Sequence, residues 1–291
     1  MMLSSVWVAL RFIHFSALML VFGSALYGAW LAPVSFRRLL ARRFLRLQQH
    51  AAAMGFISAV LMLAIQGGLM GTGWRDVGSV AVWGAVLQTQ FGGVWLWQII
   101  FAFVMLIVAV LVPRNFARLL LIIAAAQFML LAGVGHATLH DGTAGALQRI
   151  NHAVHLLCAA AWVGGLLPVI YCMHMAQNRW RQQAITTMMR FSRYGHLFVA
   201  GALCSGILNI LFITGFSVPW HSLYGQLLIL KGVLVLLMVA IALANRYVLV
   251  PRIGRKALCA HQWFIRMTKI EWAAGAAVLA TVSVFATLEP F

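Results

Sequence analysis

Four of the ten histidines in this 291-residue sequence lie close together along the chain. His136 and His140 are four residues apart, and His152 and His155 are three residues apart, so each pair falls on one face of a helix. Imidazole nitrogens bind copper, zinc, iron and nickel, and copper(II) binds most tightly among the divalent ions. Calcium and magnesium require oxygen ligands, whereas the sequence contains only 4 acidic residues. The spacing therefore predicts a histidine site for a transition metal, with copper as the first candidate.

His14 is a fifth candidate ligand because it lies inside the first apolar segment. It is eight residues from the start of that segment, which at about 1.5 Å per residue places it about 12 Å below the surface. Ionisable side chains are costly inside a membrane and are therefore functional candidates there. The predicted metal ligands are His14, His136, His140, His152 and His155. A structural alternative stays open, since histidines near helix ends also bind water or cap backbone groups.

The composition places these histidines in a membrane protein. Apolar residues make up 64% of the chain and charged residues only 9%, and the mean hydropathy is +0.96. A soluble domain has about 25% charged residues, so a soluble globular enzyme is excluded. Apolar runs of about 20 residues predict an all-α polytopic membrane protein with one integral membrane domain, residues 1–291. Its eight predicted spans are 6–32, 50–70, 93–112, 119–136, 150–172, 194–213, 227–249 and 270–288.

The cations orient this predicted bundle. The formal net charge is +17, with 21 Lys and Arg residues against 4 acids. Most cations follow the first, third, fifth and seventh spans, with large groups in the loops expected at 33–49 and 250–269. Because cytoplasmic loops are rich in Lys and Arg, both termini are expected in the periplasm, and no nucleic-acid partner is expected. The first segment lacks a basic leader and is too long for a signal peptide, so it is expected to stay as a span.

The two halves of the sequence resemble each other when four spans are placed on the next four. His14 is followed nine residues later by Gly23, and His155 is followed by Gly164 at the same distance. The pattern predicts a tandem four-plus-four helix repeat with halves 1–145 and 146–291, related by an axis along the membrane normal. The equivalent histidine pairs are His14 with His155 and His50 with His196.

These equivalent pairs permit a second chemistry. Haem b can be held between histidines on different helices of a bundle. An outer pair, His14 with His155, and an inner pair, His50 with His196, would make a transmembrane b-type cytochrome, an oxidoreductase that reduces copper. With copper alone at the histidines, the protein is a transport or metal-handling protein and not an enzyme. A structural subunit without any bound ion is the third alternative.

Three charged side chains fall inside predicted spans. Arg11 is expected to extend outward to the membrane surface. Lys231, in the seventh span, can extend to the surface in the same way. Glu271 is expected to pair with Lys269 or Arg266 at the inner surface.

Two further segments are candidates for function. Met173-His174-Met175, at the inner end of the fifth span, is a ligand-like group because thioethers bind copper(I). The loop expected at 72–92 is rich in Gly and Trp, which indicates an aromatic belt or a lid over the outer histidines.

The sequence contains no GxSxG, Walker A or HExxH motif, and no CPC or aspartyl phosphorylation motif of a copper-pumping ATPase. Any transport is therefore passive, coupled to an existing gradient, or driven by redox chemistry.

A motif made of two sequence stretches includes outer histidines and part of the fifth span. It consists of Gly135-His136-Ala137-Thr138 and of His152-x-x-His155 followed by Ala161-Trp162-Val163-Gly164-Gly165-Leu166. With these residues and eight spans, the sequence resembles the CopD family of bacterial inner-membrane copper proteins. The resemblance implies copper homeostasis, with movement of copper across the inner membrane. Together with the outward histidine cluster, it leads to the hypothesis that the protein imports copper from the periplasm. It also implies a periplasmic copper-binding partner of the CopC type, expected as a separate protein because the sequence contains no such domain.

Overall fold

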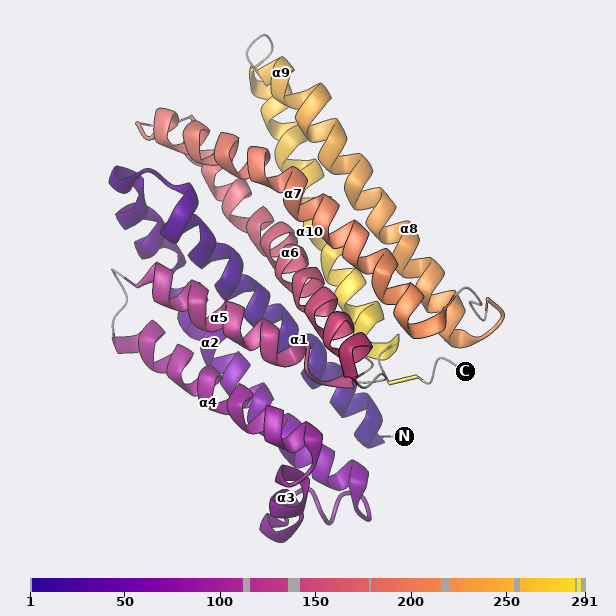
Figure 1. Ribbon diagram of the computed structural model, residues 1–291. Coiled ribbons are helices and arrows are strands. Elements are labelled where there is room, and N and C mark those ends of the chain that lie inside the picture. Colours follow the sequence, from indigo (N-terminus) through magenta and orange to yellow (C-terminus); the bar gives the residue numbers. More distant parts are fainter. Residues whose placement is uncertain are drawn as a thin grey trace.

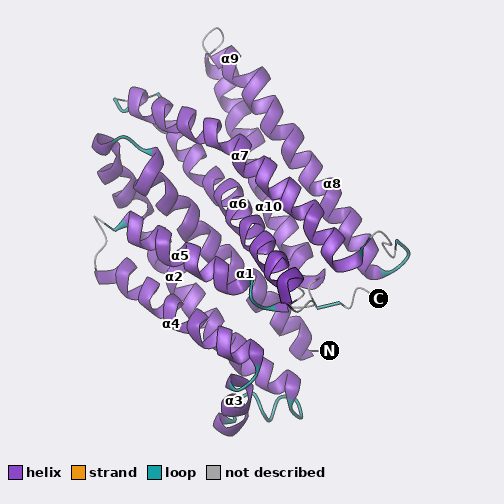
Figure 2. Ribbon diagram, viewed as in Figure 1, coloured by secondary structure: helices purple, strands orange, loops and turns teal. Residues whose placement is uncertain are grey.

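The computed structural model describes residues 2–111, 116–135, 142–177, 179–215, 220–253, 257–285 and 287–288. Within these ranges the elements are helices, without strands (Figure 2). Seven helices are long and apolar enough to cross a membrane, and another apolar helix has 15 residues. The prediction of an all-α polytopic membrane protein is therefore confirmed. The elements are α1 (Met2–Leu26), a π-helical turn (Tyr27–Leu31), α2 (Val34–Met70), α3 (Val80–Leu87), α4 (Gln90–Leu111), α5 (Ala117–Leu131), α6 (Gly142–Met175), α7 (Arg181–Thr214), α8 (Leu223–Ala244), a second π-helical turn (Asn245–Leu249), α9 (Val250–Ile253) and α10 (Ala257–Phe285).

The long helices form two groups that meet at α1 and α6 (Figure 1). In the first group, α1 packs against α2 and α5, and α4 also contacts both α2 and α5, so these four helices close into a bundle. In the second group, α6 packs against α7 and α10, and α8 packs against α10. Since α7 and α8 make little direct contact, the second group is less closed than the first.

Two glycines let the backbones of α1 and α6 approach each other closely. A Cβ atom added to Gly23 would lie 2.1 Å from the carbonyl carbon of Gly164, and one added to Gly164 would lie 2.2 Å from the carbonyl oxygen of Met19. Small residues are typical of helix contacts in membranes, where close packing replaces the hydrophobic effect as the main attraction. The glycine pair therefore holds the two groups together.

Several helices begin earlier than their predicted spans. The prediction of a loop at 33–49 is wrong, because α2 begins at Val34, and residues 257–269 belong to α10. Likewise α6 begins at Gly142 and α7 at Arg181. In α2 the reason is an apolar stripe with a spacing of four residues. Its members Phe36, Leu40 and Phe44 are buried, while most of the arginines between them are exposed.

The fourth predicted span, 119–136, corresponds to the shortest of these apolar helices. α5 begins at Ala117 and ends at Leu131, a length of about 22 Å at 1.5 Å per residue. A turn follows, and Gly135 adopts a φ of +75°, a left-handed conformation that glycine adopts readily. The helix therefore ends before the predicted boundary.

The segment 72–92, predicted as a loop, contains the short helix α3. Trp83 Nε1 donates to the carbonyl oxygen of Val77 at 2.8 Å, and α3 packs against α2 and α4. Before this helix, the Asp76 carboxylate accepts hydrogen bonds from the backbone N–H and the hydroxyl of Thr72, which hold the pKa of Asp76 below its usual value. Asp76 therefore stays ionised at neutral pH.

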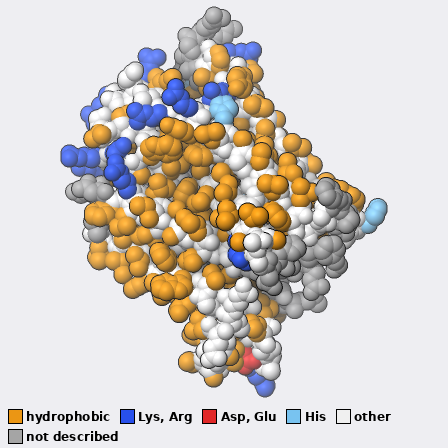
Figure 3. Space-filling model, viewed as in Figure 1, with side chains coloured by type: hydrophobic (Ala, Val, Ile, Leu, Met, Phe, Trp, Pro, Cys, Tyr) orange, Lys and Arg blue, Asp and Glu red, His pale blue; other side chains and the backbone are white. Residues whose placement is uncertain are grey.

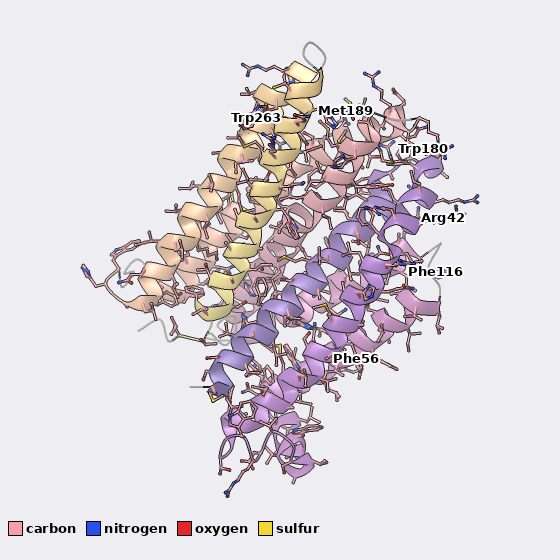
Figure 4. The ribbon with its side chains drawn as sticks, turned by 180° about the vertical axis from the view of Figure 1, so that it is seen from behind. Arg42, Phe56, Phe116, Trp180, Met189 and Trp263 are labelled. Atoms are coloured by element: carbon pink, nitrogen blue, oxygen red, sulfur yellow. The ribbon has the colours of Figure 1, made fainter. Side chains whose placement is uncertain are left out.

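Lys and Arg side chains gather at one end of the bundle, which we call the basic end. It comprises the start of α2, the residues around the α6–α7 turn, and α9, and Figure 3 shows the cations above a surface of hydrophobic side chains. Arg42, Trp180 and Trp263 mark this end from behind in Figure 4. The other end, called the opposite end, carries the start of α1, helix α3 and the end of α10 (Figure 1).

Candidate functional site

His14 is held inside the first helix group by the backbone of α2. Its side chain is fully buried, and its Nδ1 lies 3.1 Å from the carbonyl oxygen of Gly55 and 3.0 Å from Oγ of Ser58. Because the carbonyl oxygen only accepts hydrogen bonds, Nδ1 carries the proton. The lone pair of the His14 ring is therefore on Nε2.

Two glutamines occupy the Nε2 side of the His14 ring. Gln98 Nε2 lies 2.9 Å from His14 Nε2 and donates to Gln127 Oε1 at 3.2 Å, while Gln127 Nε2 lies 3.3 Å from Met105 Sδ. The side chains of this network are buried. Both nitrogens of His14 are therefore engaged by residues of its own helix group. No local pattern in the sequence indicates Gln127, because its role depends on how α4 and α5 pack.

His155 is held in the second helix group in the same way. Its Nδ1 lies 3.0 Å from the carbonyl oxygen of Ala202 and 3.2 Å from Oγ of Ser205. Ser205 Oγ donates to the same Ala202 carbonyl at 3.4 Å, as Ser58 Oγ donates to Gly55 at 3.0 Å. Unlike His14, His155 has no hydrogen-bond partner at Nε2 within the described residues. The free nitrogen of His155 is therefore available to a ligand.

His152 lies beside His155, one turn nearer the start of α6. The centroids of the two rings are 6.3 Å apart, and the rings are nearly parallel, with an interplanar angle of 14°. Asn209 of α7 places its Nδ2 3.3 Å from His152 Nδ1. The structure therefore brings these two of the five predicted ligands together. His136 and His140 lie outside the described residues.

A hollow of about 210 Å³, which we call the Arg11 hollow, lies between the helices near His152. The Arg11 guanidinium lies 5.4 Å from the centre of the Phe15 ring, and its Nε is buried with no hydrogen-bond partner in the described part of the chain. Arg11 thus packs into the protein, in contrast to the extended conformation expected from the sequence. The lining residues are Trp7, Arg11, Phe15, Met62, Gln66, Phe91, Trp95, Leu131, Val134, Gly135 and His152. Among them, Phe91 is the one residue from the segment 72–92 that was predicted as an aromatic belt or a lid.

Replacing Gln98 with leucine is expected to lower the free energy of unfolding by about 1–2 kcal/mol, because buried His14 Nε2 and Gln127 Oε1 lose a shared donor. Unfolding in mixed detergent micelles measures this loss. Gln66→Leu is the matched control, since Gln66 faces the Arg11 hollow and makes no hydrogen bond within the described residues. Equal losses in the two variants would contradict the network.

The structure does not bring together the two histidines of the predicted inner pair, His50 and His196. His50 and His196 are both exposed, and no hydrogen bond or ring contact among the described residues joins them. His14 and His155, the predicted outer pair, are each held within a different helix group. By contrast, the ring centroids of His174 and His261 are 6.5 Å apart, between α6 and α10. Sequence analysis singled out His174 but missed His261, which is distant in the chain.

Glu271 faces the interior of the second helix group. Its side chain is 2% exposed, and its Oε1 accepts a hydrogen bond from Trp162 Nε1 at 2.8 Å. The predicted pairing with Lys269 or Arg266 is wrong, because both cations are exposed on other faces of α10. Lys231 Nζ lies 5.9 Å from the centre of the Phe285 ring, towards the opposite end.

Two family descriptions match the chain. The description "Copper resistance protein D-like, N-terminal domain" matches residues 2–146, and "Copper resistance protein D" matches residues 185–285. No solved structure matches the chain.

Three curated proteins are similar to this chain. "Inner membrane protein YebZ" of Escherichia coli (strain K12) is 63% identical over 290 residues, which cover 100% of both chains. "Copper resistance protein D" of Pseudomonas syringae pv. tomato is 29% identical over 85% of this chain and 83% of its own length. "Copper transport protein CutJ" of Bacillus subtilis (strain 168) is 29% identical over 96% of this chain, which spans only 52% of CutJ. The chain therefore belongs to the copper resistance protein D (CopD) family of copper-handling membrane proteins.

Proposed function

We propose that this protein imports copper ions across the bacterial inner membrane through a histidine site at the opposite end of the bundle. The observation that carries the proposal is the pairing of His152 and His155, with the free Nε2 of His155 beside a second imidazole. The names of two relatives, a copper resistance protein and a copper transport protein, support copper as the transported ion.

The hydrogen bonds of His155 are compatible with a role as a metal ligand. Histidines that bind metals usually donate their other ring N–H to a carbonyl or carboxylate oxygen, which fixes the tautomer and the ring orientation. Ala202 provides such a carbonyl for His155 Nδ1. His14 has an equivalent tether, but Gln98 engages its Nε2, so His14 binds copper only after Gln98 moves.

The proposed copper site also includes the segment that follows α5. Gly135 lines the Arg11 hollow together with His152, and the next residue in the chain is His136. We therefore propose His136 and His140 as further ligands beside His152 and His155, with His14 as the next ligand deeper in the membrane. Imidazole nitrogens from such a set suit copper better than they suit calcium or magnesium.

The charge distribution supports an orientation for this import. Lys and Arg enrichment marks the cytoplasmic side of a membrane protein, so we assign the basic end to the cytoplasm. Both termini and the histidine site then face the periplasm. The name of the Escherichia coli relative supports an inner-membrane location. A separate periplasmic copper-binding protein of the CopC type is the expected donor, and the lipid bilayer covers the apolar surface.

The matching tethers support a tandem repeat with halves 1–145 and 146–291. In each half, a histidine of the first long helix donates to a carbonyl of the second, and a serine three residues later contacts the same nitrogen. The boundary of one family description at residue 146 falls at the same place. In this proposed repeat, the two halves are copies of one four-helix unit, and the first copy is packed more closely than the second.

Copper binding to the purified protein tests the proposed site. The His152→Ala/His155→Ala variant is expected to bind at least one copper ion fewer than the unmodified protein, because two adjacent ligands are lost. Metal analysis after dialysis against copper measures the stoichiometry. His221→Ala is the control, since His221 is exposed on the turn before α8. An unchanged stoichiometry in the double variant would rule out this pair as ligands.

A further inference from the structure

We infer that Glu271 is a proton-binding site inside the membrane and that its proton is exchanged during copper transport. Glu271 lies in the apolar helix segment Cys259–Phe285, two residues after the exposed Lys269. Ionisable side chains inside membrane helices are functional candidates. The inference rests on the proposed transport function and adds the coupling ion to it.

The surroundings of Glu271 provide a hydrogen-bond donor but no cation. Trp162, its donor, belongs to a buried cluster with Leu166, Ala202, Met238 and Ala274. An ionised carboxylate without a partner is very costly in such a place. Glu271 therefore rests as the neutral acid, whose carbonyl oxygen accepts the Trp162 N–H bond.

No cation or other titratable group in the described part of the neighbouring elements is seen to contact Glu271, and the pair of His174 on α6 and His261 on α10 lies nearer the basic end. On α8, Lys231 lies against Phe285, and on the second π-helical turn, Arg246 donates to Ser192 at 2.8 Å. On α6, His155 is two turns from Trp162, and on α1, His14 and Arg11 face the first group. The cations Arg252, Arg266 and Lys269 are exposed. Among the described residues, Glu271 thus has no counterion, and a mobile cation is the remaining way to neutralise it.

The chemistry of the group favours a proton over copper as that cation. Copper prefers nitrogen and sulfur ligands, and Glu271 contributes a single carboxyl group. A buried polar pair lies one turn nearer the basic end, where Thr268 Oγ1 is 3.4 Å from Asn245 Nδ2. Asn245 Oδ1 is buried and has no hydrogen-bond partner among the described residues. Asn245 Oδ1 lies between Glu271 and the basic end. It can therefore accept a hydrogen bond along the path of a proton that leaves Glu271 in that direction.

The exchange step changes one bond. While a copper cation passes, the O–H bond of the Glu271 acid breaks, the proton leaves to water, and the carboxylate balances part of the copper charge. When copper has left, the carboxylate takes a proton from water and the O–H bond forms again. No electron is transferred, and the only co-reactants are copper and protons.

Glu271→Gln tests the inference because the glutamine oxygen still accepts from Trp162 but cannot exchange a proton. In proteoliposomes that contain a pH-sensitive dye, the unmodified protein is expected to show copper uptake that depends on pH and is accompanied by proton movement. The variant is expected to lose both the pH dependence and the proton movement. Asp76→Asn, which changes an exposed carboxylate outside the membrane, is expected to retain them.

Infrared difference spectroscopy gives a second readout that does not require transport. Adding copper to the unmodified protein is expected to reduce a carboxylic acid band that is missing from Glu271→Gln. If Glu271→Gln transports copper with an unchanged pH profile, or if copper leaves the band unaltered, the inference is wrong while the proposed function stands. If the unmodified protein moves no copper, the proposed function fails and the inference fails with it.

Discussion

Replacing His152 and His155 together with alanine is expected to lower copper uptake into cells at least about tenfold. Changing only the partners that orient a metal ligand costs about 10–100-fold in affinity or activity, and this variant removes two proposed ligands themselves. The two rings lie 6.3 Å apart, on adjacent turns of α6. Whole-cell copper content of a bacterial strain that expresses each variant provides the measurement.

Two controls separate lost ligands from lost structure. His221→Ala removes an exposed histidine near the same end and is expected to leave uptake unchanged. Circular dichroism of the purified double variant is expected to show full helicity, because Ser205 still donates to the Ala202 and Gly201 carbonyls after the His155 ring is removed. Normal uptake by a folded double variant would contradict the proposed entry site.

Replacing Gly164 with leucine is expected to destabilise the protein by more than about 3 kcal/mol, beyond the usual range for overpacking a core. The first atom of the new side chain would lie 2.2 Å from the carbonyl oxygen of Met19, and this contact involves backbone atoms that a change of rotamer cannot move. The two helix groups would have to separate at α1 and α6. The yield of folded protein and its unfolding temperature in detergent measure the effect.

Gly232→Leu is the matched control for this prediction. Gly232 lies in the membrane helix α8, and a Cβ atom added there meets no atom within 4 Å. The substitution is therefore expected to change stability little. If Gly164→Leu were as stable as Gly232→Leu, the close contact between α1 and α6 would be wrong.

Sequence patterns predicted the fold well because apolar length is a local property. Each long membrane helix contains the core of its predicted span, but the patterns missed where the helices begin beyond the membrane. The stripe of Phe36, Leu40 and Phe44 was a detectable signal for the extension of α2, yet the arginines between its members suggested a loop. The early end of α5 depends on the turn that leads to Gly135, which hydropathy does not report.

The candidate site could be predicted only in part, because its details depend on how helices pack. The spacing of His152 and His155 correctly placed both on one helix face. Their partners Asn209 and Ala202 come from α7, and no local pattern links them. In the same way, Glu271 had nearby cations in sequence, but the face of α10 that carries it turns towards Trp162 of α6.

In the proposed repeat, a shift of one residue in the alignment changes which histidines are equivalent. The tethers match Gly55 with Ala202 and Ser58 with Ser205, one residue away from the register that matched His50 with His196. One residue rotates a helix position by about 100°, since a turn has 3.6 residues. In the proposed repeat, the tethers pair His14 with His155, and their register makes Leu197, one residue after His196, the equivalent of His50.

Uptake of copper by proteoliposomes that contain only this protein tests the central claim most directly. With the protein inserted in one known orientation, we expect copper supplied on the side of the opposite end to accumulate inside vesicles, and the His152→Ala/His155→Ala variant to accumulate at least about tenfold less. Accumulation no greater than in protein-free vesicles would contradict the proposal that this protein carries copper across the membrane.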